Sequence, residues 1–169
     1  NQNLVFSCIE HETVQCTYNA NDNPNDFAGA LAAFAECRIA SAGVDGYCSG
    51  TTNEAQGLSN QDFCSGPNTD IGFHTIIPFT VSCAGMYHFR MHADYGYGGY
   101  MGIDGAEHAA GDIWGHVFVE DVALTEGDHY WESLGFEGCC DGHSEIEVHL
   151  PADAESDPWR LVVAGPTDT

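Results

Sequence analysis

Residues 85–105 read GMYHFRMHADYGYGGYMGIDG, and this stretch decides the fold that we predict for the chain. Apolar side chains alternate with polar ones at its start, which is the period of a β-strand with one face in a core and the other in water. The residues expected in the core are Tyr87, Phe89, Met91 and Ala93, and those expected outside are His88, Arg90 and His92. Asp94 and Gly96 then mark a turn, and the chain returns through Ile103-Asp-Gly. The stretch predicts a two-stranded ribbon.

Segments of the same kind lie on both sides of this ribbon. Further strands are expected at 4–6, 73–83, 115–124, 130–136, 145–150 and 159–163. Alternation over residues 145–150 places Ile146, Val148 and Leu150 inside and Glu145, Glu147 and His149 outside. Short strands separated by Gly-rich and Asp-Gly turns are typical of all-β folds. We expect an antiparallel, jelly-roll-like β-sandwich.

One helix is expected in the N-terminal part of the chain. Phe27, Leu31 and Phe34 recur at helical spacing after a capping Asp26, and Gly43 marks the end. We interpret residues 1–169 as a single extracellular domain. Residues 1–72 would form a disulfide-pinned part that carries the helix, and residues 73–165 would supply the core strands.

The eight cysteines indicate an oxidising compartment. They are Cys8, Cys16, Cys37, Cys48, Cys64, Cys83, Cys139 and Cys140. An even number without the spacing of a zinc or redox motif predicts disulfides. Spacing alone does not give the pairing, because eight cysteines allow about 105 arrangements. The adjacent Cys139 and Cys140 could bond to each other or to two separate partners, and we favour two partners.

The charge of the chain limits its partners. There are 26 acidic residues against three arginines, and the net charge is −23. Such a surface repels the phosphates of nucleic acids and the headgroups of anionic membranes, so neither is expected as a partner. The sequence starts at Asn1 without an apolar leader, and we predict a secreted protein whose signal peptide has been removed.

Catalytic and transition-metal motifs do not stand out. We find no nucleophile elbow, phosphate-binding loop or dinucleotide fingerprint, so we do not expect an enzyme. His88 and His92 share a strand face, but they would lie about 13 Å apart in an extended chain, which is too far to share an ion.

The ribbon and the segment after it resemble the protective-antigen-type domain, a β-sandwich of anthrax protective antigen, yeast flocculins and many secreted glycosidases. In that family a strand reaches a Ser-Asp-Asp-Gly turn and the next strand carries Ile-Asp-Gly, as residues 94–96 and 103–105 do in part here. Residues 122–129, VALTEGDH, are similar to the family's Leu-x-x-Gly-x-His element. The resemblance covers residues 73–150.

The resemblance implies a calcium-assisted sugar site. Lectin members hold calcium with two successive aspartates joined by a cis peptide bond, and the ion binds sugar hydroxyls. Asp94 matches the first aspartate, whereas Tyr95 stands in place of the second. Asp94 and Asp104 are therefore the candidate calcium ligands, although Asp94 could instead only close its turn.

Aromatic residues near the predicted loops could bind sugar rings without a metal. The candidate ligand-binding residues are Asp94, Tyr95, Tyr97, Tyr100 and Trp114. We expect Tyr97 to be exposed, and Trp131 to be buried within its strand. The predicted function is a non-catalytic adhesion module that binds glycans. The alternative is a structural subunit of an extracellular filament, sheath or coat, whose partners are copies of itself.

Overall fold

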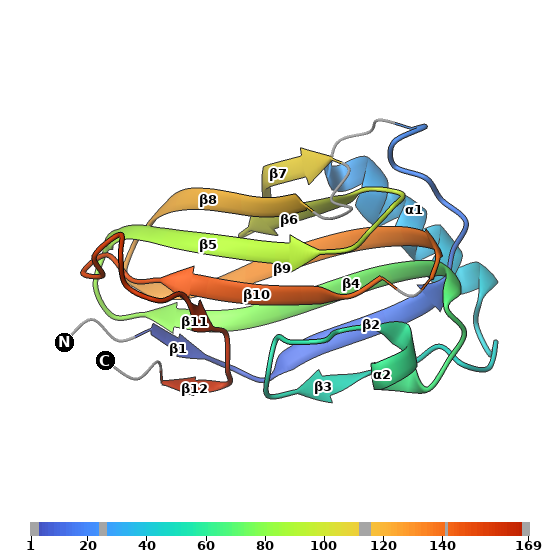
Figure 1. The fold of residues 1–169 in the computed structure, drawn as a ribbon, viewed down its shortest axis with the longest axis horizontal. Helices are drawn as coiled ribbons and strands as arrows, with labels where there is room; N and C mark the ends of the chain where they lie inside the picture. The colour runs from blue at the N-terminus through green and yellow to red at the C-terminus, as the bar shows by residue number, and fades with distance from the viewer. Residues whose placement is uncertain (1–3, 24–26, 112–115, 141, 167–169) are drawn as a thin grey trace.

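A computed structural model describes residues 4–23, 27–111, 116–140 and 142–166 of the chain. Two antiparallel sheets lie face to face, and the helix α1 lies beside the larger sheet (Figure 1). The elements of the N-terminal part are β1 (Leu4–Phe6), β2 (Ile9–Gln15), α1 (Phe27–Ala40), β3 (Ser49–Thr52) and α2 (Asn60–Cys64). The remaining strands are β4 (Thr69–Val81), β5 (Gly85–Ala93), β6 (Gly99–Ile103), β7 (Ala106–Gly111), β8 (His116–Leu124), β9 (Gly127–Cys139), β10 (Ser144–His149), β11 (Arg160–Leu161) and β12 (Gly165–Pro166).

The larger sheet has the order β12-β1-β4-β9-β6-β7, and β2 and β3 join it through β4. The smaller sheet has the order β11-β10-β5-β8. The main core lies between the two sheets and includes Phe73, Phe89 and Trp131, each at most 1% exposed. A second cluster lies between α1 and the larger sheet, where Phe34 packs with Leu134 and Phe136. The predicted antiparallel sandwich is therefore confirmed.

Burial follows the predicted alternation in the strands that face the core. In β5 all four side chains expected inside are buried, and in β10 Ile146 and Val148 are fully buried. The prediction was wrong for His149, which is only 6% exposed because the ring of Trp159 stacks on it at 4.3 Å. Trp131 is buried as expected.

The predicted ribbon of residues 87–105 does not form. Strand β5 pairs with β8 and β10 in the smaller sheet, whereas β6 pairs with β7 and β9 in the larger one. All five residues of β6 are buried, because the sandwich core covers one face of this strand and α1 approaches the other. A strand buried on both faces belongs inside a covered sheet and not in an exposed ribbon. Residues 94–98 thus connect the two sheets.

The N-terminal part is more regular than the sequence indicated. Strands β2 and β3 and the helix α2 fall where the sequence predicted no strand or helix, and β2 pairs with β4 over six residues. Helix α1 buries Phe27 and Phe34, but Leu31 is 36% exposed, so the apolar stripe is narrower than predicted. The disulfides Cys16–Cys37 and Cys48–Cys64 attach α1 and α2 to their neighbouring strands. No helix among the described residues is both long and apolar enough to cross a membrane.

Candidate functional site

Two segments meet at one end of the sandwich, and together we call them the loop pair. The first is residues 94–98 between β5 and β6. The second is residues 138–143, which comprise the end of β9 and the loop before β10, and of which 141 lies outside the described part. The backbone N–H of Asp94 donates to the carbonyl of His143 at 2.9 Å. Gly96 and Cys139 donate their N–H groups to the two oxygens of the Glu137 carboxylate, at 2.6 and 2.8 Å. Glu137 is only 4% exposed, so a buried carboxylate fixes both loops.

Residues 18–21 form the third side of this end. The Asn21 side-chain amide donates to the Gly96 carbonyl at 3.2 Å, and the Ala20 N–H donates to the Tyr97 carbonyl at 2.8 Å. The ring of Tyr18 lies 4.8 Å from that of Phe136, edge to face. The backbone of residues 94–98 is therefore bonded on both sides, which gives the loop a defined shape.

The tyrosines predicted to bind a ligand differ in burial. Tyr95 is 1% exposed and stacks on Phe73 at 4.9 Å, so it is a core residue and not a loop platform. Burial raises the pKa of its phenol, which stays protonated. Tyr100 is buried against Phe27. Tyr97 is half-buried, where we had expected it to be exposed. Trp114 lies outside the described residues.

Close packing of two tyrosine rings explains why β9 has glycine at positions 135 and 138. A Cβ atom on Gly135 would lie 2.1 Å from the Tyr95 ring, and one on Gly138 would lie 2.3 Å from the Tyr97 ring. Both rings thus lie directly on the backbone of β9. Tyr95 points between the sheets, whereas Tyr97 packs with the cluster beneath α1.

Asp94 and Asp104, the candidate calcium ligands, are not brought together. Asp104 accepts the Tyr130 N–H at 3.0 Å and contacts His129 at 2.6 Å, whereas the loop of Asp94 is bonded to Glu137. Tyr130 and Glu137 are seven residues apart in β9, about 23 Å along an extended strand. Tyr95 carries no carboxylate and its ring is buried on Phe73, so the residues present do not fit a site of two successive aspartates.

Cys139 and Cys140 form a disulfide with each other, so the pairing with two separate partners was wrong. The two residues are neighbours at the exposed end of β9, and the other pairs are already closed elsewhere. Cys8 and Cys83 remain as free thiols. The vicinal disulfide therefore adds an exposed sulfur surface to the loop pair.

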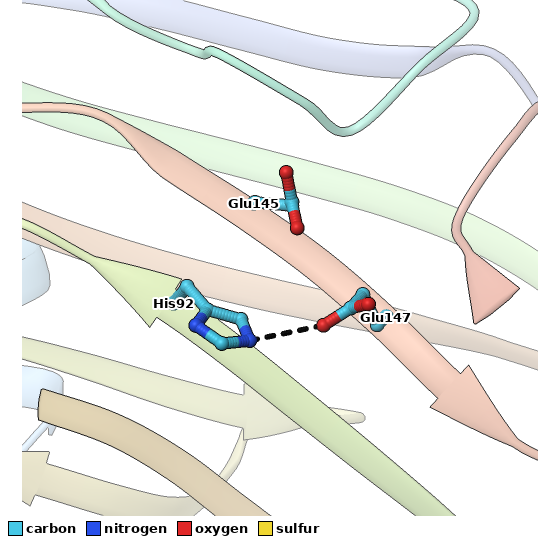
Figure 2. Close-up of side chains that lie close together, drawn as sticks. All are labelled: His92, Glu145 and Glu147. Carbon is cyan, nitrogen blue, oxygen red and sulfur yellow. Dashed lines mark hydrogen bonds and ion pairs between the residues drawn. The ribbon is translucent and has the colours of Figure 1, made fainter. Parts of the chain in front are cut away.

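A group of possible metal ligands lies on the outer face of the smaller sheet, close to the loop pair. It consists of His92 on β5 with Glu145 and Glu147 on β10, whose side chains gather in Figure 2. One ligand atom from each lies within 4.8 Å of the others. Sequence reasoning placed all three on wet faces but did not bring them together, because it did not show that β5 and β10 are neighbours. The register pairs His92 directly with Glu145.

A hollow of about 300 Å³ lies beside β2, away from the loop pair. Glu10, Glu12, Arg38 and His74 are among its lining residues. Arg38 pairs with Glu12, and His74 with the buried Glu132 at 2.7 Å. Glu12, Arg38 and His74 thus already have partners within the fold.

No protein-family model matches the chain, and no curated protein matches it by sequence. Solved structures do match by shape. The PA14 domain of the MpAFP antifreeze protein has a TM-score of 0.60 at 14% identity, over 95% of this chain and 88% of that one. The fold is that of PA14 domains.

Two further structures with this fold are named for sugar binding or adhesion. The PA14 sugar-binding domain of an RTX adhesin has a TM-score of 0.52 at 17% identity and covers 94% of this chain and 99% of its own. The A domain of epithelial adhesin 9 from Candida glabrata, in complex with Galβ1-3GlcNAc, has a TM-score of 0.56 at 11% identity, covering 96% and 91%. The PA14 fold thus extends over almost the whole chain, beyond the residues 73–150 of the sequence resemblance.

Proposed function

We propose that the chain is an extracellular carbohydrate-binding module that binds glycans at the loop pair. The observation that carries this proposal is the fold, which is shared along nearly the full length of domains named as sugar-binding. Fold alone does not define function, so the chemistry of the loop pair has to supply the site.

The loop pair offers the groups that a sugar needs. A sugar ring has C–H groups that pack on apolar surfaces and hydroxyl groups that donate hydrogen bonds. The half-buried Tyr97 and the exposed Cys139–Cys140 disulfide supply apolar surface, and the Asp94 carboxylate is an acceptor. Glu137 holds the two loops in place before a ligand arrives, which lowers the entropic cost of binding.

Asp94→Ala tests this site. We expect the substitution to weaken glycan binding at least about tenfold, because a hydrogen bond to a charged group contributes about 1.5 to 3 kcal/mol. Glycan-array binding and calorimetry with Galβ1-3GlcNAc would measure the loss. Asp104→Asn, at the other end of the sandwich, is the matched control and should bind like the native protein. Equal affinity of the Asp94→Ala variant and the native protein would remove the loop pair from the mechanism.

Calcium is tested in the same experiment by adding a chelator. Because Tyr95 is buried where the second aspartate would stand, we expect glycan affinity to be unchanged. Loss of binding in chelator, restored by added calcium, would contradict this expectation and place an ion at Asp94.

The two free thiols favour a second candidate, a covalently linked extracellular assembly. Ser7 bonds to Pro78 and Leu4 pairs with Val81, so Cys8 and Cys83 lie beyond opposite ends of the β1–β4 ladder. The three residues of strand between these two levels span about 10 Å, and both cysteines lie outside this span, whereas bonded cysteines have Cα atoms less than about 7 Å apart. The two thiols therefore do not pair within one chain.

In this second proposal Cys8 of one copy bonds to Cys83 of the next. Each thiol loses a proton and an electron, and a small-molecule disulfide takes them up and leaves as two thiols. A contact between two different surfaces repeats from copy to copy and gives rings or open polymers. Oxidised protein should form a ladder on a non-reducing gel that Cys8→Ser abolishes. A single monomer band after oxidation would exclude the assembly.

A further inference from the structure

We propose that His92, Glu145 and Glu147 bind a divalent transition-metal ion, with Zn²⁺ as the representative. In the described part of the chain, these three side chains are the group of His, Cys, Asp or Glu residues that lie close enough together to hold a metal ion. The site does not depend on the proposed sugar site, since it uses the outward face of β5 and β10 and not the loops.

The three side chains are close to the spacing that a shared ion needs. The Nε2 atom of His92 lies 3.0 Å from the Oε2 atom of Glu147. Two ligands of a tetrahedral zinc ion, with bonds of about 2.0 to 2.1 Å, lie about 3.3 Å apart. No pair in the group is separated by more than 4.8 Å. Glu145, on the flank, has to approach by at most about 1.5 Å, which a rotation of its side chain provides.

Both carboxylates are already oriented by other side chains. Glu147 accepts from Arg90 Nε at 2.7 Å, and the Gln56 amide donates to Glu145 at 2.8 Å. Arg90 is itself held under the ring of Trp159, 4.4 Å from its centroid. Groups that orient the ligands in this way are a regular part of metal sites. Glu147 is only 12% exposed, so its carboxylate is held in one place by this contact with Arg90.

Arg90 does not use up the Glu147 carboxylate. The bonds from Arg90 and His92 all converge on Oε2 of Glu147. Within the described residues no hydrogen bond is made to Oε1, which is available as a ligand in addition to Oε2. An ion there would link β5 to β10. His92 and Glu145 are paired next to Ala93 and Ser144, which are the last strand residues before the loop pair.

The choice of ion follows from the donor set. One imidazole nitrogen and two carboxylates suit zinc and similar ions, whereas calcium prefers six to eight oxygens. The net charge of −23 concentrates cations around the molecule without selecting among them. Selectivity therefore has to come from the imidazole of His92.

Calorimetric titration of the chelator-treated protein with ZnCl₂ tests the site. We expect one saturable site, and a rise in melting temperature of about 5 to 10 °C at a zinc concentration 100 times the dissociation constant. His92→Ala and Glu145→Gln should each lower the affinity at least about 100-fold, more than the loss of an orienting group. His88→Ala is the matched control, because His88 lies on the same strand face but its ring bonds to Asp121, which is not part of the group. It should bind zinc like the native protein.

Two results would overturn the proposal: no saturable site in the native protein, or the same zinc affinity in His92→Ala as in the native protein. If a variant does not fold, as judged by circular dichroism, anomalous scattering from zinc in crystals of the native protein decides instead. A peak between the three side chains supports the site, and its absence there contradicts it. Glycan binding without zinc would be unaffected in either case, so this test is separate from that of the loop pair.

Discussion

Asp94 and Asp104 each follow a strand and lead into a turn, but the two ends of the sandwich use them differently. At the Asp104 end the aspartate fixes its own turn, since both of its oxygens contact neighbours, His129 and the Tyr130 N–H. At the loop pair the turn is held instead by the buried Glu137, whose carboxylate accepts hydrogen bonds from the N–H groups of Gly96 and Cys139. Within the described part of the chain no hydrogen bond or ion pair involves the Asp94 carboxylate, which is the acceptor that the proposed glycan site uses.

The largest effect should come from Tyr95, the residue that anchors the loop pair in the core. Tyr95→Ala leaves a cavity beside Phe73 and should lower the free energy of unfolding by about 3 to 5 kcal/mol. Urea denaturation would measure it. Tyr97→Ala is the matched control from the same loop: it should cost less than half as much but weaken glycan binding. An equal loss of stability in both variants would contradict the assignment of Tyr95 to the core and of Tyr97 to glycan binding.

Glu137→Gln should give the next largest effect. The amide has only one acceptor oxygen for two backbone donors, so one partly buried N–H loses its partner, at a cost of about 1 to 3 kcal/mol. Thermal melts followed by circular dichroism would show the loss. Glu126→Gln, an exposed position, should change stability little. An unchanged melting temperature in Glu137→Gln would show that the loops hold their shape without this carboxylate.

The smallest effect concerns His129 at the Asp104 end. Burial opposes its charge, but the hydrogen bonds to Asp104 and to the Thr125 carbonyl outweigh this, and the pKa of His129 is raised. Because the folded-state pKa is above the unfolded one, the stabilisation is complete below about pH 6.5 and is lost as the pH rises through the folded pKa. Asp104→Asn should therefore cost more stability at pH 5.5 than at pH 8.

The native protein alone is a poor test of this pH dependence. Burial lowers the pKa of His11 to about 4, so His11 destabilises the fold as the pH falls from about 6.5. The difference between the native protein and the Asp104→Asn variant cancels this contribution, since His11 is present in both. An equal cost of the substitution at both pH values would contradict the assigned coupling of His129 and Asp104.

The sequence predicted where the strands lie along the chain better than it predicted which strands pair with each other. Alternation identified β5 and β10 and their inward residues, because burial of one face leaves a period of two in the residues themselves. The pairing of β6 with β9 joins residues that are 28 to 36 positions apart in the chain, and no local pattern carries it. The absence of alternation in residues 99–103 was the available signal that β6 is covered on both faces.

The same limit applies to the candidate sites. Asp94 and Tyr97 could be placed at a turn from sequence, but Glu137, which holds that turn, lies 40 residues away and looked like one of many surface acids. His92 and Glu145 meet only through the register of β5 and β10. Tyr95 was misplaced because a residue in a turn can still point into the core when the turn joins two sheets.

Binding of a glycan at the loop pair is the central claim, and its most direct test is an NMR titration of the ¹⁵N-labelled protein with Galβ1-3GlcNAc. We predict that amide shifts change at residues 94–98, at residues 138–143 and at Asn21, and that the amides of Asp104 and Tyr130 stay in place. Shifts confined to the Asp104 end, or no shifts with any glycan that the array identifies, would contradict the claim.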